Sequence, residues 1–185
     1  MRKAALVLAL CLLATPLAAA DDLPPGGTFS ATATMTTSQG TRSLPVTVVV
    51  SHSIGLDQTA PLKRMLAEGG QRALAAYIRG GREGMIRLGA LETPIELIVA
   101  EKTDDGARYF VVTSRAMSFE EVQLGSPSLD FPFAILAFDV PDFGTGEGRV
   151  LPKAALAVDE DGHVVAAQYD AEPGKLTDVK AIDPL

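Results

Sequence analysis

Residues 57–81 read DQTAPLKRMLAEGGQRALAAYIRGG and form the only long helical pattern in this sequence. At about 100° per residue, apolar and small side chains gather on one stripe and charged side chains fall on the opposite side. Because β-branched segments lie on both sides of the helix, we expect the stripe to cover a sheet built from the rest of the chain. The predicted stripe consists of Leu62, Met65, Leu66, Gly69, Ala73, Ala76 and Tyr77.

The ends and the middle of this helix carry local signals. Thr59 is a suitable N-cap, Pro61 is tolerated in the first turn, and Gly80-Gly81 ends the helix. Gly69-Gly70 in the middle costs about 1 kcal/mol per glycine relative to alanine. We therefore expect the helix to bend there or to split into two short helices. The small residues of the stripe also predict an unusually close contact between helix and sheet.

The rest of the chain contains nine candidate strands. Residues 28–37 alternate strictly between two faces, and residues 44–54 repeat the alternation with His52 on the apolar face, so the two predict a hairpin. Asp104-Asp105-Gly106 is a strong hairpin turn signal. The other strands are expected at residues 84–88, 94–101, 108–114, 131–140, 149–158, 163–169 and 175–182.

One early helix followed by hairpins predicts an α+β fold, in which a mainly antiparallel sheet is packed by one long, kinked helix. A β-sandwich or barrel with a helical cover is the alternative. We expect residues 28–185 to form a single domain, which is large enough to bury a core without disulfides. Residues 21–27, DDLPPGG, are expected to be a flexible linker before it.

Residues 1–20, MRKAALVLALCLLATPLAAA, have the parts of a secretory signal peptide. Arg2 and Lys3 are followed by an apolar core too short for a stable membrane anchor, and small residues precede a predicted cleavage after Ala20. Cys11 brings a lipoprotein signal into consideration, but it follows Leu10 where that signal needs a small residue. We therefore expect a protein that is periplasmic or secreted.

The composition narrows the classes of partner. Without residues 1–20 the chain has 14 basic and 23 acidic residues, a net charge of −9, which argues against nucleic acid and anionic membranes as partners. No second apolar run is long enough to cross a membrane. The mature chain has no cysteine and no tryptophan, so thiol chemistry and stacking on sugars or bases have little support.

Few residues suit catalysis. His52 and His163 are the only histidines, whereas catalytic zinc normally has three protein ligands. Ser51 and Ser53 flank His52, but neighbouring strand residues point to opposite faces. We interpret His52 as a histidine at the end of a core strand, with a ligand or general base as the alternative. We expect no catalytic residue, no metal site and no cofactor.

Two short motifs resemble ligand-binding loops only superficially. The glycines of GTGEG at residues 144–148 lie between two strands, whereas a dinucleotide loop leads from a strand into a helix. We therefore predict a flexible hairpin loop. Residues 159–162, DEDG, lack the other ligands of an EF-hand calcium loop. They are predicted to form a solvated turn, with weak surface calcium binding as the alternative.

The longest irregular stretch, residues 115–130, holds the best candidates for binding. Loops on rigid scaffolds often carry binding sites, so the charged side chains in and around this stretch are candidate contacts for an unknown protein or small-molecule partner. The alternative is that Arg115 pairs with a carboxylate and fixes the loop. The candidate residues are Arg115, Glu120, Glu121 and Asp130.

Several segments together resemble a known group of proteins. They are RYFVVTSRAMSFEEV (108–122), DFPFAILAFD (130–139), GTGEGRV (144–150), PGKLTDVKAI (173–182) and the GGQ inside the helix. These segments resemble a family of exported bacterial proteins of unknown function, over residues 57–182. The resemblance implies an exported, compact domain and brings no activity, cofactor or catalytic residue with it.

The leading hypothesis is an exported, non-catalytic binding or interaction domain of the cell envelope or the extracellular space. A hydrolytic enzyme is the first alternative, and it requires His52 or the 115–130 loop to face a concave pocket beside other perturbed groups. An envelope scaffold or assembly factor is the second, and it requires an exposed apolar patch or a free sheet edge.

Overall fold

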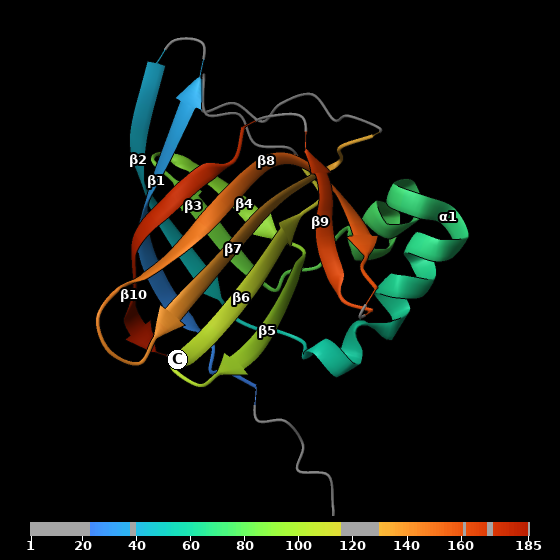
Figure 1. Cartoon of the computed structure of the whole chain (residues 1–185), viewed down its shortest axis with the longest axis horizontal. Helices are drawn as coiled ribbons and strands as arrows, with labels where there is room; N and C mark the ends of the chain where they lie inside the picture. The colour runs from blue at the N-terminus through green and yellow to red at the C-terminus, as the bar shows by residue number, and fades with distance from the viewer. Residues whose placement is uncertain (1–22, 38–39, 116–129, 161, 170–171, 185) are drawn as a thin grey trace, which may run out of the picture.

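The computed structural model describes residues 23–37, 40–115, 130–160, 162–169 and 172–184. Within these residues the chain forms ten strands, one α-helix and a short 3-10 helix (Figure 1). The elements are β1 (Gly27–Thr37), β2 (Gly40–Val50), η1 (Leu56–Thr59), α1 (Ala60–Ile78), β3 (Gly84–Leu88), β4 (Leu91–Ile95), β5 (Leu97–Thr103), β6 (Gly106–Thr113), β7 (Phe133–Pro141), β8 (Gly146–Val158), β9 (Val164–Tyr169) and β10 (Gly174–Pro184).

All ten strands belong to one sheet in which neighbouring strands pair antiparallel. The order across the sheet is β4-β3-β2-β1-β10-β8-β7-β6-β5, and β9 also pairs with β8. Figure 1 shows that the sheet curls into a half-barrel with α1 on one side. The expected combination of a mainly antiparallel sheet and one helix is therefore confirmed, and the curl agrees with the barrel-like alternative.

The concave face of the sheet holds the larger core. Phe29 of β1 and Tyr109 of β6 have ring centroids 4.9 Å apart, although β10, β8 and β7 lie between their strands in the sheet order. Phe138 of β7 lies 5.8 Å from the first ring and 5.4 Å from the second. Rings so far apart in the sheet meet only because the sheet curls around them. The cavity beside Phe29 and Phe138 is only about 10 Å³, so the side chains are closely packed at this point of the core.

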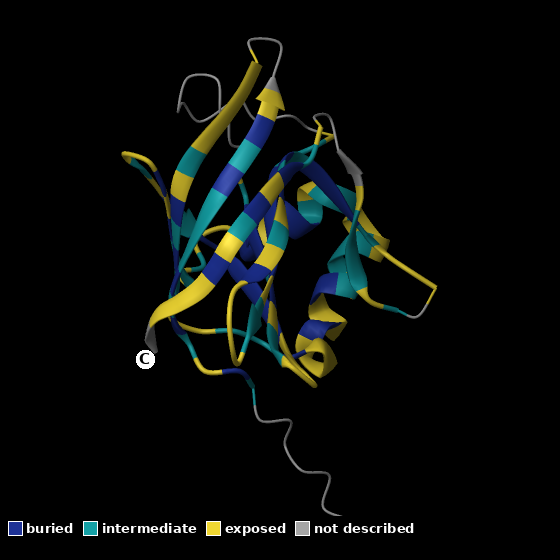
Figure 2. Cartoon of the chain, turned by 60° about the vertical axis from the view of Figure 1, so that its left-hand side comes forward, coloured by how far each residue is buried: buried dark blue, intermediate teal, exposed yellow. Residues whose placement is uncertain are grey.

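The outer face of β5 to β8 carries a second core, which α1 covers (Figure 2). The alternation of a strand separates the two cores, since Leu97 of β5 belongs to the outer core and Ile98 to the inner one. The expectation that the helix covers the sheet is confirmed. The buried residues of this outer core are Leu62, Leu74, Ala75, Ile78, Leu97, Val99, Val112, Phe133, Ile135, Ala154 and Leu156.

The expected break in the helix lies at Gly70, whose φ of 61° and ψ of −156° suit glycine best. Before the break the predicted stripe is correct for Leu62, which is buried, and for Met65 and Leu66, which pack against the outer core. It is wrong for Gly69, which is exposed. After the break it is wrong, since Tyr77 is 54% exposed and Ala76 is exposed as well. The break changes the angular phase of the second half. The residues buried there are Leu74, Ala75 and Ile78.

Two differences from the predicted strands shape the region around Glu83 and Glu96. The second strand ends at Val50, because the N–H groups of Ser51 and His52 both donate to the carbonyl oxygen of Glu83, at 2.8 and 3.0 Å. The strand predicted over residues 94–101 is divided at Glu96 into β4 and β5. The described residues therefore form ten strands where the sequence predicts nine.

The glycines of GTGEG are largely strand residues. Gly146 and Gly148 lie in β8, so the prediction of a flexible loop over residues 144–148 is wrong for most of its length. A Cβ on Gly146 would lie 1.9 Å from the carbonyl oxygen of Asp139, and one on Gly148 would lie 2.4 Å from that of Ala137. These glycines are therefore explained by the close approach of β7.

The segment before β1 contacts the half-barrel. Pro24 is buried, and the hydroxyl of Tyr109 donates a hydrogen bond to the carbonyl oxygen of Pro25 at 2.8 Å. The predicted signal peptide and its cleavage after Ala20 lie outside the described residues and stay predictions. In the part of the chain that the structure describes, no helix combines the length and the apolar character needed to cross a bilayer.

Candidate functional site

A groove of about 510 Å³ lies between α1, the segment that follows β2, and the corner where β4 passes into β5. We call it the helix-corner groove. Its apolar lining comes from both ends of the helix and from the start of β5, so the groove opens where the outer core reaches the surface. The apolar residues that line it are Ile54, Leu62, Tyr77, Ile78, Leu97 and Ile98.

Polar side chains surround this apolar lining. Tyr77 adds a half-exposed ring, and Arg79 follows the last helical residue, with its N–H donating to the carbonyl oxygen of Ala75 at 3.2 Å. Polar groups on an apolar groove are the usual means by which a protein orients a ligand. The polar side chains that line the groove are His52, Ser53, Gln58, Arg79, Glu83 and Glu96.

The main chain of Glu83 holds one wall of the groove in place. Its carbonyl oxygen accepts from Ser51 and His52, and its N–H donates to the carbonyl oxygen of Ile95 at 2.9 Å. Nearby, Ile54 forms a parallel bridge with β5, donating to Ile98 and accepting from Ala100 at 2.9 Å each. The wall that carries His52, Glu83 and Glu96 is therefore built on paired backbone and does not depend on a loose loop.

His52 does not occupy the core position that the sequence predicts. Its side chain is 78% exposed and lines the helix-corner groove. The strand that would have turned it inward ends two residues earlier, so the alternation that predicted its face no longer applies. Its Nδ1 lies 4.0 Å from Oε2 of Glu83, which is an ion-pair distance only when the imidazole is protonated.

Glu96 is the groove residue that sequence reasoning missed. It is 8% exposed, and its carboxylate accepts hydrogen bonds from the N–H and the hydroxyl of Ser114, at 2.8 and 2.7 Å. A signal was present in the sequence, because Glu96 is the single charge within the apolar run from Pro94 to Ala100. A carboxylate in such a run indicates a break in the strand or a buried polar site.

A second, smaller hollow of about 280 Å³ lies beside the N-terminal segment. Leu23 and Pro24 line it together with Leu56, Asp57 and the central part of β5. Leu23 and Pro24 precede the first strand and belong to the segment whose Pro25 accepts a hydrogen bond from Tyr109. This segment therefore forms part of the wall of the hollow.

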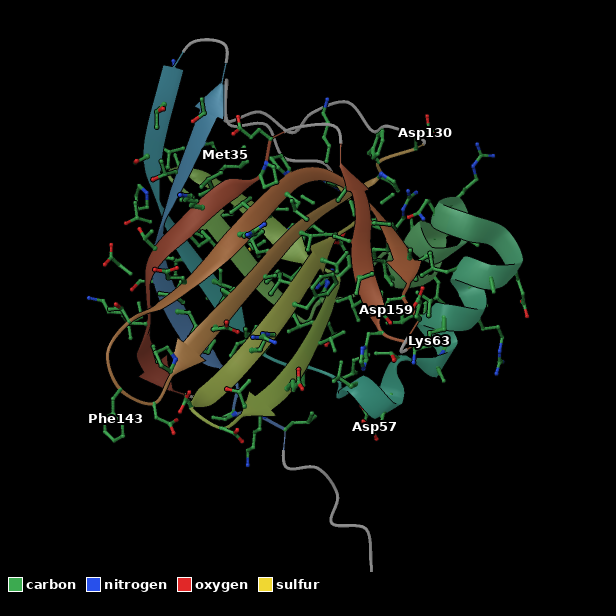
Figure 3. All side chains as sticks on the ribbon, viewed as in Figure 1. Met35, Asp57, Lys63, Asp130, Phe143 and Asp159 are labelled. Atoms are coloured by element: carbon green, nitrogen blue, oxygen red, sulfur yellow. The ribbon has the colours of Figure 1, made fainter. Side chains whose placement is uncertain are left out.

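The candidate residues of the 115–130 stretch stay a prediction. Arg115 and Asp130 have exposed side chains, and the carbonyl oxygen of Arg115 accepts from the hydroxyl of Thr113 at 2.7 Å. Glu120 and Glu121 lie outside the described residues. Figure 3 shows Asp130 and Phe143 at opposite ends of the molecule in that view.

The acidic turn after β8 agrees with the predicted solvated turn in the residues that are described. The side chain of Asp159 accepts from the N–H of His163 at 2.7 Å, and both side chains are partly exposed to solvent. His163 is 52% exposed and far in sequence from the groove histidine. Among the described residues, no group of three or more His, Cys, Asp or Glu side chains is arranged to hold a metal ion.

The chain was compared with protein-family models, with curated proteins and with solved structures, and none of the three comparisons found a match. The resemblance to exported bacterial proteins of unknown function therefore stays a prediction from the sequence segments quoted above.

Proposed function

We propose that this protein is an exported binding domain without catalytic activity, and that its ligand occupies the helix-corner groove. The observation that carries the proposal is an apolar groove of about 510 Å³ whose polar residues stand on paired backbone. Sites for small ligands commonly have this size, a mainly apolar wall and a few fixed polar groups. The predicted signal peptide and the acidic net charge support an exported domain whose partner is not nucleic acid.

The test is binding of Nile red, a neutral dye that fluoresces in apolar surroundings. Tyr77→Ala removes a half-exposed ring from the groove without opening the core. We expect it to weaken dye binding about three- to tenfold, since the lost apolar contact is worth roughly 1 kcal/mol. Phe143→Ala is the matched control, because Phe143 is 93% exposed and does not line the groove.

Saturable dye binding that Tyr77→Ala weakens and Phe143→Ala leaves unchanged would support the groove as the site. The proposal is wrong if the folded protein shows no saturable binding, or if both variants lose affinity equally. Circular dichroism and the urea midpoint of each variant establish that the fold is retained. The intact mass of the exported protein tests the predicted start at Asp21.

The hydrolase alternative gains one observation, since His52 lines a groove beside Glu83. The distance of 4.0 Å between their side chains is too long for a hydrogen bond, and a 78% exposed imidazole is poorly shielded from water. A screen against ester, peptide and glycoside substrates tests the alternative. Turnover that His52→Ala abolishes, with the fold intact, would replace the binding proposal with an enzyme.

The scaffold alternative rests on β9. Among the described strands, β9 pairs only with β8, and its sequence VVAAQY contains no charge and no proline. Free edges of this kind can add a strand from another chain. Sedimentation velocity across a concentration series tests self-association, and Val165→Lys should abolish it if this edge is responsible.

A further inference from the structure

Glu96 occupies a corner that the main chain fixes on both sides. Ile95, the last residue of β4, pairs with Gly84 of β3. Leu97, the first residue of β5, pairs with Val112 of β6. The N–H of Glu96 itself donates to the carbonyl oxygen of Val112 at 3.2 Å. The residue therefore has little freedom to move to the surface, although it carries a charged side chain and is 8% exposed.

In the described part of the chain, the hydrogen-bond partners of the Glu96 carboxylate are neutral. Ser114 supplies both hydrogen bonds, one from its N–H and one from its hydroxyl. Among the described residues, no lysine, arginine or histidine side chain forms an ion pair with Glu96. A carboxylate can accept about four hydrogen bonds, so the described residues use roughly half of its capacity. A buried charge is costly unless an opposite charge compensates it.

The groove places a second carboxylate on the same wall. Glu83 also lines it, with its Oε2 4.0 Å from Nδ1 of His52. Arg79 is the one arginine or lysine among the lining residues, and it stands at the end of the helix on the other wall. The sheet wall is therefore anionic, while the floor between the walls is apolar.

We propose that the helix-corner groove selects a small organic cation, namely a primary amine with an apolar body whose ammonium group pairs with Glu96. The inference rests on the proposed binding function of the groove. The ammonium donates to the open positions of the carboxylate, Glu83 adds a second negative charge, and the apolar body lies on Leu62, Ile78 and Leu97. The net charge of −7 of the whole chain draws cations toward it.

The experiment measures displacement of Nile red by octylamine, octanol and octanoate, which share a chain and differ in the head group. We expect octylamine to compete about tenfold better than octanol, as one charge-assisted hydrogen bond provides, and octanoate to compete worst. Glu96→Gln should abolish the preference for the amine over the alcohol, while the amide oxygen still accepts from the N–H of Ser114 and the amide NH2 can donate to the Ser114 hydroxyl. Glu92→Gln is the control, since Glu92 is an exposed carboxylate paired with Arg87 away from the groove.

The outcomes separate the two proposals. Equal competition by the three compounds against bound dye would overturn the cation inference and leave the groove as a binding site. A preference for octylamine that survives Glu96→Gln would also overturn it. Absence of dye binding would overturn the proposed function itself. If Glu96→Gln does not fold, Glu83→Gln takes its place and should reduce the amine preference about threefold; an unchanged preference in that variant would contradict the role given to this wall.

Discussion

The side chain of Gln71 pairs with both main-chain groups of Leu156. Its Nε2 donates to the carbonyl oxygen of Leu156 at 2.6 Å, and its Oε1 accepts from the N–H of Leu156 at 2.9 Å. Leu156 lies in β8 beyond Ala154, the last residue that β7 pairs on this strand. The amide of a helical residue therefore does for β8 what the backbone of a neighbouring strand would do, and it fixes α1 just after its break at Gly70.

Gln71→Ala should lower the free energy of unfolding by about 1–3 kcal/mol, because it leaves a partly buried N–H and a carbonyl oxygen without their partner. Urea denaturation followed by circular dichroism measures the change. Arg72→Ala is the control, as Arg72 is the next residue and is exposed, and its effect should stay within about 0.5 kcal/mol.

Gln71→Glu sharpens this test. The carboxylate still accepts from the N–H of Leu156, but it sets a negative oxygen against the carbonyl oxygen where the amide donated. We expect it to destabilise the fold at neutral pH at least as much as Gln71→Ala does. Losses no larger than that of the Arg72 control would show that the pairing contributes nothing to stability.

The helix shows how far the sequence could predict the structure. Periodicity located α1 and its buried face correctly up to the two glycines, and composition predicted the break. The angle through which Gly70 turns the chain depends on its φ and ψ, which the sequence does not encode in any pattern. The same holds for Gln71, which a helical wheel places among solvent-facing charges and which the break brings against β8.

Leu74→Ala tests the phase of the helix after the break. Leu74 of α1 is fully buried in the outer core, so truncating it should cost about 2–5 kcal/mol through lost burial and the cavity left behind. Ala76→Leu should change stability by less than about 0.5 kcal/mol, because Ala76 is exposed. An uninterrupted helix from Leu62 predicts the opposite order, with Ala76→Leu overpacking the interface, so the urea midpoints of the two variants decide between the two phases.

The candidate site was harder to predict than the fold. Alternation assigned His52 to the core because nothing local shows that Ser51 and His52 both bond to Glu83, thirty residues later in the chain. Glu96 lies in a run of strand-forming residues. Its role in the groove depends on the hydrogen bonds from Ser114 and on the end of the helix, which forms the opposite wall. Each of these groups comes from a different part of the chain, and only tertiary structure brings them to one groove.

Gly146→Ala tests whether the glycines of β8 are required by packing. A Cβ at this position would meet the carbonyl oxygen of Asp139, a backbone atom that cannot move aside by a rotamer change. We expect a loss of about 2–4 kcal/mol. Thr145→Ala, at the exposed residue just before it, should be nearly neutral. Similar thermal midpoints for the two variants would mean that the strands are further apart than described.

Ionisation of Tyr109 makes the free energy of unfolding depend on pH in the alkaline range. Burial raises the pKa of its phenol to about 12, whereas the pKa of tyrosine in an unfolded chain is about 10. Between these two values the unfolded chain loses the phenolic proton while the folded protein keeps it. Unfolding then releases a proton, so the free energy of unfolding is highest below about pH 10 and falls as the pH rises toward about 12.

Tyr109→Phe should remove this contribution. At neutral pH the variant is less stable by about 0.5–1.5 kcal/mol, because the hydrogen bond to Pro25 is lost. Its urea midpoint should nevertheless fall less steeply than that of the unsubstituted protein above about pH 10, so the two curves approach each other. Titration of every other group is common to both proteins and cancels in the difference. Parallel curves across this range would mean that the phenol ionises in the folded protein as readily as in the unfolded chain, which a ring held between Phe29 and Phe138 does not allow.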